Sequence, residues 1–430
     1  MSTRNHYRVA VRTAGLLTVA GIALTACGGG GDAAGEGGDV TLRFSWWGSD
    51  QRTANTEEVI AAFEEEHPNI TIEGEYGDFQ GYWDKLATQT AGGDAADIIQ
   101  MDLAYLREYA ERGALMDITE VETEQIGDML LEQGRSDGGQ YGIPTGFASV
   151  AMIANTSVFD RAGVELPDDT TWTWDDYAQV TQEVAGSGDE AHGSMAPFEP
   201  VAGLQVWLRQ HGAGVTDDAG ALAMSSDDLV SYFEHLDQLA QDGTFPEASV
   251  IEEDRSAGVE QSLIATGGVG LIYGWSNLYP TVVEHAAGDL ELLRYPSPAG
   301  SAADNGMWHR ASMFLSGSAE TDHPEEVQEF IDFFVNSETS GLANLTDRGL
   351  PANAEVREAV LEELDGSEAE AAQFLEDIAP EVSDPAPVPP QGAGELEDIM
   401  HRYQAELLFE RLSPEEAGEQ AFEEIESAVG

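Results

Sequence analysis

Residues 40–48, VTLRFSWWG, open the part of the chain whose pattern decides the fold class. The apolar residues Leu42, Phe44 and Trp46 alternate with residues of the other face. A period of two is typical of a β-strand with one buried side. The segment therefore predicts a strand whose C-terminal end carries a pair of tryptophans.

A helix is expected directly after this strand. Thr53, Asn55 or Thr56 can cap its N terminus, because short polar side chains accept hydrogen bonds from the first free backbone N–H groups. Apolar residues within 59–63 form a buried stripe at helical spacing, and Pro68 lies beyond the end of the helix. The first two elements are thus predicted as a strand and then a helix.

The same alternation continues along the chain. Strand patterns at 69–76 and 96–101 alternate with helical patterns at 81–93 and 103–115, and Gly113 closes the second of these helices. Strands that alternate with helices predict an α/β fold with a mostly parallel sheet. In such sheets, ligands bind beyond the carboxyl ends of the strands.

Helices predominate after an extended segment at 141–155. Thr173 and Asp176 have the spacing of a capping box at the start of one helix. Further helices are predicted at 203–213, 227–241 and 324–335, and from Ser413 onward. The Pro-rich residues 383–394 predict an extended surface connection.

The N-terminal residues indicate export. Arg4, Arg8 and Arg12 precede an apolar stretch at 13–24, which is the pattern of a secretory signal peptide. This stretch is shorter than the roughly 20 apolar residues that a membrane-spanning helix needs, and no later segment supplies them. We therefore expect an exported chain without a transmembrane segment.

Cys27 is the only cysteine in the chain, so it has no partner for an internal disulfide. The motif Leu24-Thr25-Ala26-Cys27 resembles the lipobox of bacterial lipoproteins, in which the signal is cut before the cysteine and the sulfur receives a diacylglycerol. This resemblance implies a signal peptide at 1–26, lipidation of Cys27 and a flexible Gly-rich tether at 27–39. A spare cysteine in a discarded peptide is the alternative.

Acidic residues dominate the composition. The chain has 81 Asp and Glu against 18 Lys and Arg, a net charge of -63, and Lys85 is its only lysine. Such a surface repels a phosphate backbone, which excludes nucleic acid as a partner. Because the acids are spread along the chain, we favour a solvated surface adapted to salty or alkaline surroundings over a site for a cationic ligand.

No enzyme motif stands out. The chain has no G-x-G-x-x-G after a strand, no P-loop, no H-E-x-x-H and no G-x-S-x-G. Its nine histidines show no metal-ligand spacing, and carboxylate pairs for glycoside hydrolysis could be chosen anywhere among the 81 acids. We therefore expect a binding protein with no catalytic residues, no cofactor and no metal.

The tryptophans indicate a pocket. Trp46, Trp47, Trp275 and Trp308 each lie at or near the end of a strand-like run, where a pocket wall is expected. The other tryptophans have helical spacing and are expected in the core: Trp83, Trp172, Trp174 and Trp207.

Rings of this kind suit a carbohydrate. An indole that covers the apolar face of a sugar removes about 100 Å² from water, which is worth about 2.5 kcal/mol. Asp102, Asn277 and Arg310 could then select the sugar through hydrogen bonds. A surface salt bridge is the alternative interpretation of Asp102 and Arg310.

Four segments carry a family resemblance. They are WDKLATQTAGGDAADIIQMD (83–102), YAERGALMDIT (109–119), the segment 141–177 that begins YGIPTGFASVAM, and SPEEAGEQAFEEIESAV (413–429). Together they resemble family 1 extracellular solute-binding proteins, the receptors of ABC sugar importers. The likeness runs from about residue 40 to the C terminus.

The resemblance implies a two-lobed periplasmic-binding-protein clamshell, in which each lobe is a mostly parallel sheet flanked by helices. The chain would cross the hinge three times, near Thr145 to Ala148, near Tyr295 to Pro298 and near Arg348 to Asn353. The implied division gives residues 40–147 plus 297–350 to lobe 1 and residues 148–296 plus 351–430 to lobe 2.

The resemblance also implies a ligand site between the lobes. GWSN at 274–277 resembles the family's site element, whose tryptophan stacks on the sugar, so Trp275 takes that role with Asn277 beside it. The other candidate ligand residues are Trp47, Phe79, Tyr82, Asp102, Phe147, Glu199, Trp308 and Arg310. Phe79 and Tyr82 belong to one loop, and which of them faces the cleft stays open.

The expected function is that of a lipid-anchored receptor on the outer face of the cell membrane. As a monomer, it would capture a mono- or oligosaccharide, close around it and present the closed form to the permease subunits of an ABC importer. Three alternatives remain: the same fold binding a polyamine, peptide or glycerol phosphodiester, a secreted glycoside hydrolase, and a surface sensor or adhesion protein.

Overall fold

The computed structural model describes residues 38–188, 190–217, 220–382, 389–390 and 392–429. The predicted signal peptide, the predicted lipidation site Cys27 and most of the predicted tether lie outside the described residues. The described residues from Asp39 onward form one compact unit. No helix in the described ranges combines the length and the apolar character that a membrane span requires.

The chain begins with three strand–helix pairs, as the alternating pattern predicted. They are β1 (Val40–Trp47), α1 (Asp50–Glu66), β2 (Ile70–Gly77), α2 (Phe79–Gly92), β3 (Ile98–Met101) and α3 (Leu103–Glu111). β1 lies between β2 and β3 and pairs in parallel with both. The carboxyl ends of these strands therefore lie at one edge of the sheet.

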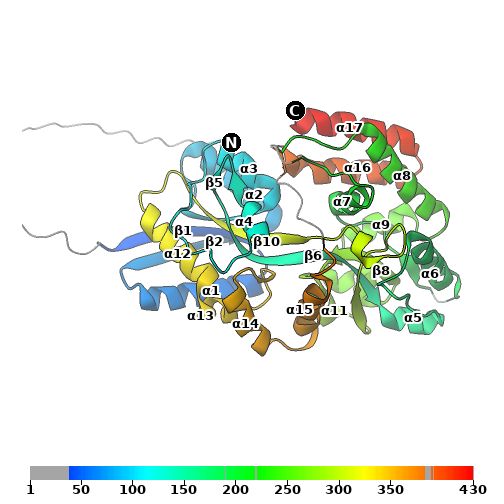
Figure 1. Cartoon of the computed structure of the whole chain (residues 1–430), viewed down its shortest axis with the longest axis horizontal. Coiled ribbons are helices and arrows are strands. Elements are labelled where there is room, and N and C mark those ends of the chain that lie inside the picture. The colour runs from blue at the N-terminus through cyan, green and yellow to red at the C-terminus, as the bar shows by residue number, and fades with distance from the viewer. Residues whose placement is uncertain (1–37, 189, 218–219, 383–388, 391, 430) are drawn as a thin grey trace, which may run out of the picture. The chain divides into compact units, whose positions relative to one another are not determined.

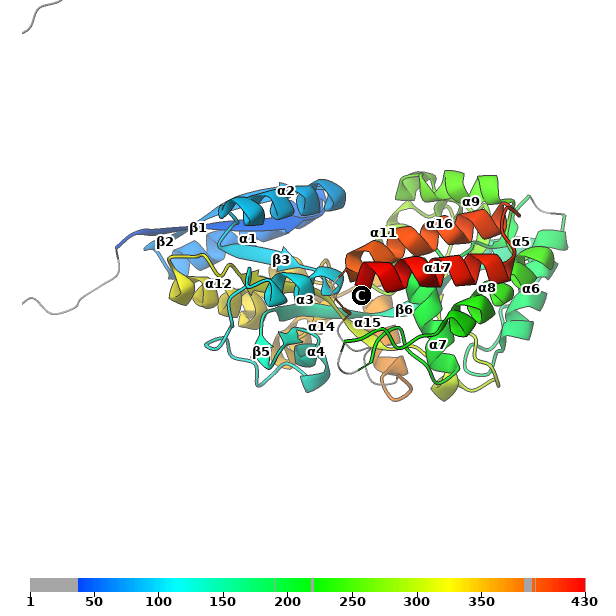
Figure 2. The ribbon, with the colours of Figure 1, turned by 90° about the horizontal axis from the view of Figure 1, so that it is seen from above.

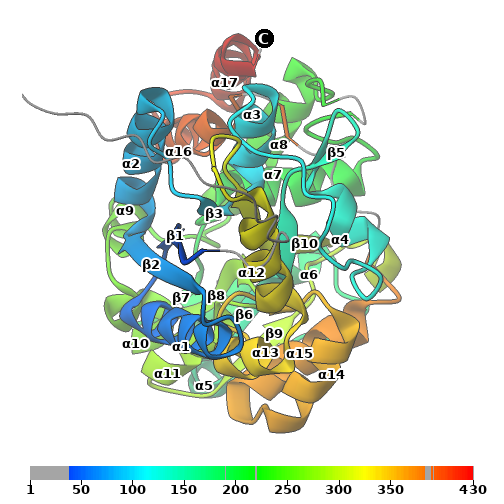
Figure 3. The ribbon, with the colours of Figure 1, turned by 90° about the vertical axis from the view of Figure 1, so that its left-hand side faces the viewer.

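The two faces of β1 pack against different helices. Phe330 of α12 (Pro324–Asn336) lies between Phe44 and Phe63 of α1, with its ring centroid 5.4 and 5.0 Å from theirs. Trp47 packs instead against Trp83 of α2, at a centroid distance of 5.6 Å. Figure 3 shows α2 on one side of β1 and β2, and α1 on the other.

The start of α1 differs from the prediction. Its N-cap is Ser49, whose hydroxyl accepts a hydrogen bond from the backbone N–H of Arg52 at 3.2 Å. Thr53 and Thr56 were predicted as caps together with Asn55, but their hydroxyls donate to the carbonyls four residues earlier, as helical residues do. The helix begins earlier because Ser49 follows the end of β1 closely enough to cap it.

The remaining strands, except β4 and β5, continue one large sheet. They are β4 (Arg135–Ser136), β5 (Gly139–Gln140), β6 (Ile143–Asn155), β7 (His192–Ser194), β8 (Val269–Trp275), β9 (Leu290–Leu293), β10 (His309–Gly317) and β11 (Leu350–Pro351). The sheet order is β2-β1-β3-β10-β6-β8-β7, with β9 and β11 also paired to β6, while β4 and β5 form a separate pair.

The long strand β6 joins two groups of elements. Its first half pairs antiparallel with β10, and its second half pairs antiparallel with β8 and β9. In Figure 1, β6 and β10 run between the group around β1 and the group around β8.

Helices surround both groups. Those not yet given are α4 (Asp128–Glu132), α5 (Thr156–Ala162), α6 (Trp174–Gly186), α7 (Pro200–Gln210), α8 (Ser226–Gln241), α9 (Ala248–Arg255), α10 (Leu263–Thr266), α11 (Tyr279–His285), α13 (Glu338–Asn344), α14 (Ala354–Glu363), α15 (Gly366–Ile378), α16 (Leu396–Leu408) and α17 (Pro414–Val429). The predicted capping box of Thr173 and Asp176 is present at the start of α6. Figure 2 shows α16 and α17 side by side, and α17 packs on α8.

The architecture confirms the predicted α/β fold with two lobes flanked by helices. Pairing is parallel among β1, β2 and β3 and between β7 and β8, whereas the strands that pass between the lobes pair antiparallel. Antiparallel pairing follows because the chain runs out along β6 and returns along β10.

The division of the chain between the lobes stays a proposal. Gln210 of α7 donates hydrogen bonds to the carbonyls of Pro296 and Asn305, both at 2.8 Å, which favours a second crossing at His309 over one near Tyr295 to Pro298. α14 packs against α13, and α15 packs against α11. This favours a third crossing between α14 and α15.

Candidate functional site

A cavity of about 1500 Å³, which we call the main cavity, is lined by residues at the C-terminal ends of β1, β3 and β8. Most of the predicted site residues line it: Trp47, Phe79, Asp102, Glu199, Trp275, Asn277, Trp308 and Arg310. Strand ends from both groups of elements therefore meet at one space, as expected for an α/β sheet.

The first wall of the main cavity consists of Trp47, Phe79 and Tyr105. Trp47 ends β1 and contacts Phe79 edge to face, at a centroid distance of 5.5 Å. Tyr105 stacks on Trp83, with 3.8 Å between ring centroids and 22° between the rings. Trp83 also packs against Trp47, so this wall is supported by other aromatic rings.

Tyr82 is placed behind the first wall and does not line the main cavity among the described residues. Its hydroxyl donates a hydrogen bond to the carbonyl of Gln100 at 2.6 Å, and its ring packs against Trp47 at 5.2 Å. Phe79, by contrast, is 45% exposed at the start of α2. Of the two candidates on α2, Phe79 therefore lines the cavity, whereas Tyr82 lies over the sheet.

Trp46 is also placed away from the cavity, although its position at a strand end suggested a pocket wall. Its side chain is only 1% exposed and packs against Phe44 and Tyr76. Consecutive residues of a strand point to opposite faces, so Trp46 and Trp47 cannot both face the cavity.

The second wall of the main cavity consists of Glu199, Trp275, Trp308 and Arg310. The indole N–H of Trp275 donates a hydrogen bond to the Glu199 carboxylate at 2.7 Å. Trp308 contacts Trp275 edge to face at 5.8 Å. In the second wall, charged side chains contact the Trp275 ring, whereas the rings of the first wall contact other aromatic rings.

Arg310 covers one face of Trp275. Its guanidinium carbon lies 4.4 Å from the centroid of the Trp275 ring, which is a cation–π contact. A solute that stacks on this face therefore has to displace Arg310. Asn277 lines the cavity just beyond Trp275, in the turn between β8 and α11.

Asp102 is shared between the helix and the cavity. One of its carboxylate oxygens caps α3 by accepting the backbone N–H of Ala104 at 2.9 Å. The other lies 3.7 Å from the guanidinium of Arg310. The salt bridge weighed as an alternative is thus present, and it brings together the first and second walls.

Phe147 is placed at the joint between the two groups of elements. It lies on β6, opposite Ala311 of β10 and Leu350 of β11, and is only 9% exposed. Its ring packs against His309 at 5.1 Å and under the guanidinium of Arg357 at 5.4 Å. The structure therefore places Phe147 in the packing of the crossing strands, outside the described lining of the main cavity.

Three residues of α16 line the main cavity and were not predicted, Leu396 and the titratable pair Glu397 and His401. Glu397 accepts the backbone N–H of Val201 at 3.3 Å, and its other carboxylate oxygen lies 3.7 Å from the His401 ring. Burial, followed by the charge of Glu199, raises the pKa of Glu397 to about 8, while burial lowers the pKa of His401. The only sequence sign of this pair is its spacing of four residues on one helix.

A buried polar network contacts the backbone of Trp47 and so supports the first wall. Arg348 is 2% exposed and donates to the side chains of Gln100, Asn344 and Thr56 at 2.8–3.0 Å. Gln100 in turn donates to the carbonyl of Trp47 at 3.1 Å. Burial lowers the pKa of Arg348 to about 9, which still leaves it charged at neutral pH. Arg348 thus positions the strand end that carries Trp47.

The arrangement suits the binding of an uncharged polar solute with apolar faces. Aromatic rings on both walls offer flat apolar surface, and carboxylates, amides and a guanidinium offer hydrogen bonds at the ring edges. No group of three or more His, Cys, Asp or Glu side chains in the described residues is placed to hold a metal ion.

Comparison with known proteins agrees with this geometry. The model of the family of bacterial extracellular solute-binding proteins matches residues 58–370. The chain belongs to this family. The predicted resemblance is therefore confirmed, and the matched residues include both the start of α2 and the second wall of this solute-binding protein.

The individual relatives that this chain matches have low sequence identity to it. An "uncharacterized lipoprotein in oleD 5'region" from Streptomyces antibioticus is 28% identical over 335 residues, which is 74% of this chain and 72% of that protein. An oligogalacturonide-binding protein from Yersinia enterocolitica was solved with saturated digalacturonic acid. Its structure matches this one with a TM-score of 0.80 at 21% identity, and the match covers 91% of this chain and 98% of the Yersinia chain.

A second solved structure has the same fold. It is an ABC substrate-binding protein from Listeria monocytogenes in complex with cycloalternan. It matches this structure with a TM-score of 0.77 at 20% identity, and the match covers 90% of this chain and 98% of the Listeria chain. At these identities, the two solved structures show the fold of this solute-binding protein and leave its solute to be inferred from the cavity.

Proposed function

We propose that this protein captures a mono- or oligosaccharide in the main cavity and delivers it to the permease of an ABC importer. The observation that carries the proposal is the pair of aromatic walls, Trp47 with Phe79 and Trp275 with Trp308, that line one cavity. Structural neighbours that bind oligogalacturonide and cycloalternan support the sugar class.

The energetics are adequate for a useful affinity. Each ring that covers a sugar face contributes about 2.5 kcal/mol, by the area argument given above. A micromolar site needs about 8 kcal/mol, so two or three rings supply most of it. The cavity of about 1500 Å³ exceeds the roughly 300–1,000 Å³ of common small-molecule pockets, which leaves room for more than one sugar ring.

The charges of the cavity favour a neutral sugar. The carboxylates that line it are Asp102, Glu199, Glu284, Asp347, Asp365, Glu368 and Glu397, and the guanidiniums are Arg52 and Arg310. Arg52 is already paired with Asp347 at 2.8 Å, and Arg310 lies 3.7 Å from Asp102. A uronic acid would therefore meet excess negative charge, because both guanidiniums of the described lining already have a carboxylate beside them.

The transport role includes the predicted anchor. We infer a monomeric, non-catalytic receptor that is held on the outer face of the cell membrane through lipidated Cys27. Closure of the lobes would make the liganded form the one that the permease binds, because only a ligand that contacts both walls favours the closed state.

Calorimetric titration with a panel of neutral mono- and oligosaccharides tests the function. We expect at least one neutral sugar to bind at micromolar or tighter affinity, and the matching uronate to bind far more weakly. Binding of a polyamine, peptide or glycerol phosphodiester without any sugar would overturn the substrate class. Turnover of a glycoside that a single carboxylate substitution abolishes would instead establish an enzyme.

A further inference from the structure

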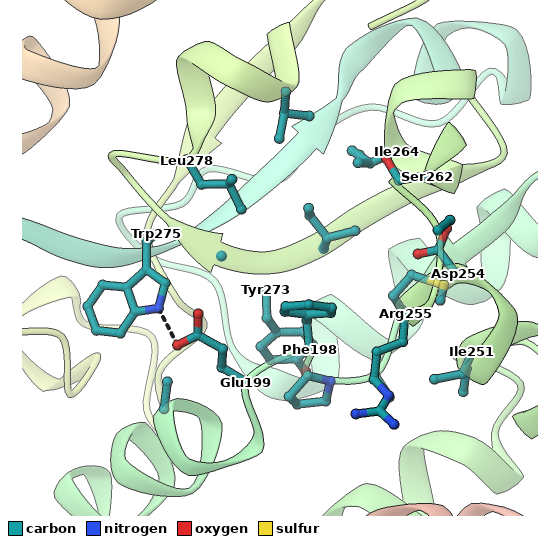
Figure 4. Close-up of a pocket in the computed structure, with 18 of the residues that line it drawn as sticks. Phe198, Glu199, Ile251, Asp254, Arg255, Ser262, Ile264, Tyr273, Trp275 and Leu278 are labelled. Carbon is teal, nitrogen blue, oxygen red and sulfur yellow. Dashed lines mark hydrogen bonds between the residues drawn. The ribbon is translucent and has the colours of Figure 1, made fainter. Parts of the chain in front are cut away.

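A second, smaller cavity adjoins the main cavity behind Trp275. This side chamber has a volume of about 190 Å³, and Phe198, Glu199, Ala202, Trp275 and Leu278 line both spaces. Figure 4 shows Trp275 and Glu199 at one side of the chamber and Asp254, Ile251 and Arg255 at the other. The hydrogen-bonded pair of Trp275 and Glu199 therefore forms the partition between the two spaces.

The interior of the side chamber is mostly apolar. Ile251, Ile264 and Leu278 face it together with the rings of Phe198 and Tyr273. Its charged groups already have partners. Asp254 accepts the backbone N–H of Leu263 at 2.6 Å, and Arg255 is paired with Glu252 at 3.2 Å. The chamber thus offers mainly apolar surface to a ligand, and the charged side chains named here are already engaged.

Among the described residues that line the side chamber, the Tyr273 hydroxyl and the side-chain carbonyl of Gln404 have no hydrogen-bond partner. Gln404 of α16 is 5% exposed, and its amide N–H donates to the carbonyl of Pro197 at 3.0 Å. Its carbonyl oxygen is buried and accepts no hydrogen bond in the described part of the chain. A buried acceptor without a donor is costly, so a ligand that brings an O–H or N–H group would satisfy it.

We propose that the side chamber holds the aglycone of a glycoside. This aglycone is a single aromatic or alkyl group about as large as one six-membered ring, and it bears a hydroxyl. This inference rests on the sugar-binding function proposed above, and it identifies the solute as an amphiphilic glycoside. The size agrees, because a dry apolar cavity of about 150 Å³ in another protein binds benzene. The shared partition allows one solute to place its sugar in the main cavity and its aglycone behind Trp275.

Paired ligands test the aglycone directly. For each sugar of the panel, the methyl glycoside and the phenyl glycoside are titrated by calorimetry against the purified chain. We expect the phenyl glycoside to bind at least tenfold more tightly than the methyl glycoside of the same sugar. If methyl glycosides bind and phenyl glycosides bind no more tightly, the side chamber proposal is overturned while the sugar function stands.

Two matched variants locate the effect. Ala257 lines only the side chamber and Ala343 only the main cavity, and both are half-buried. Ala257→Trp should abolish the phenyl advantage and leave methyl glycoside binding unchanged, whereas Ala343→Trp should weaken both glycosides alike. A phenyl advantage that survives Ala257→Trp contradicts the proposal.

Free aromatic probes keep the test independent of the sugar and of whether Ala257→Trp folds. Benzyl alcohol should bind more tightly than toluene, because its hydroxyl can donate to Gln404, and Gln404→Met should remove this preference. Binding of benzyl alcohol without binding of any glycoside would refute the sugar function and still support the chamber as a site. An equal affinity for benzyl alcohol and toluene in the unmodified chain would overturn the assigned role of Gln404.

Discussion

The two walls of the main cavity are both aromatic, but they are supported in different ways. Trp47 of the first wall rests on the rings of Tyr82 and Trp83, and its strand end is held by a buried polar network. Trp275 of the second wall is held by the charged side chains of Glu199 and Arg310. We therefore expect the first wall to respond to changes in packing and the second to changes in charge.

The largest effect is expected beneath the first wall. Replacing Arg348 by methionine leaves the buried acceptors of Gln100, Asn344 and Thr56 without their donor. The lost bonds should lower the free energy of unfolding by roughly 3 kcal/mol, about 1 kcal/mol for each. Chemical denaturation measures this change.

The matched control is Arg43→Met on the outer part of the same sheet. Arg43 pairs with Glu75 at 2.8 Å and is 27% exposed, so its loss should cost about 1 kcal/mol or less. If both variants are equally stable, Arg348 does not support the first wall in the way inferred.

The two tryptophans should differ in their effect on sugar affinity. Trp275→Leu removes a ring face, the hydrogen-bond donor of Glu199 and the cation–π contact of Arg310, so affinity should fall roughly 100-fold, or about 2.7 kcal/mol. Trp47→Leu removes a ring whose neighbours can still pack, and affinity should fall roughly tenfold. Titration calorimetry with the best sugar of the panel gives both values.

Trp46→Leu is the control for this pair. Trp46 neighbours Trp47 in the chain but is buried on the other face of β1. It should lower stability and leave the sugar affinity unchanged. Equal losses of affinity for Trp47→Leu and Trp275→Leu would remove the proposed difference between the walls.

Local pattern was enough to predict the elements that carry the first wall. Strand periodicity and helical stripes predicted β1 to α3, and the rule for carboxyl ends indicated Trp47 and Asp102 as site residues, whereas the stacking role of Trp275 came from the family resemblance. The start of α1 was misplaced because three other polar residues near it, Thr53 among them, also had capping side chains.

Contributions from distant segments could not be predicted. Glu397 and His401 reach the main cavity only because α16 packs against α7, which lies far away in the chain. Arg348 gives no local signal either, since its partners Thr56 and Gln100 come from the first part of the sequence. Such contacts depend on tertiary packing, and no period of two or 3.6 residues encodes them.

Glu397, whose pKa is raised by burial and by Glu199 of the second wall, predicts a dependence of stability on pH. Burial and the charge of Glu199 raise the pKa of Glu397 in the folded state from 4.5 to about 8. The unfolded chain therefore ionises this carboxyl first, so the free energy of unfolding should fall as the pH rises from about 5 to about 8. Because the side chain is 37% exposed, solvent screening should limit this fall to roughly 1 kcal/mol.

Glu397→Gln tests this dependence. The amide stays neutral at every pH, so the part of the decrease that is due to Glu397 should disappear in this variant between pH 7 and pH 8, the upper end of that range. The lowered pKa of His401 acts in the opposite sense and below its ordinary value of 6.5, so it does not contribute in this window. Denaturation curves at the two pH values, with Glu368→Gln as a control on the same cavity, decide the outcome.

The smallest expected effect separates charge from hydrogen bonding in the second wall. Glu199→Gln keeps an oxygen that can accept the indole N–H of Trp275 but removes the negative charge. A charge-assisted hydrogen bond is roughly twice as strong as a neutral one, so the loss should be about 1 kcal/mol, or about fivefold in sugar affinity. Tyr105→Phe in the first wall removes only a hydroxyl and should leave affinity unchanged. If Glu199→Gln also leaves affinity unchanged, the charge of Glu199 does not help to hold Trp275, and the proposed difference between the walls loses its main support.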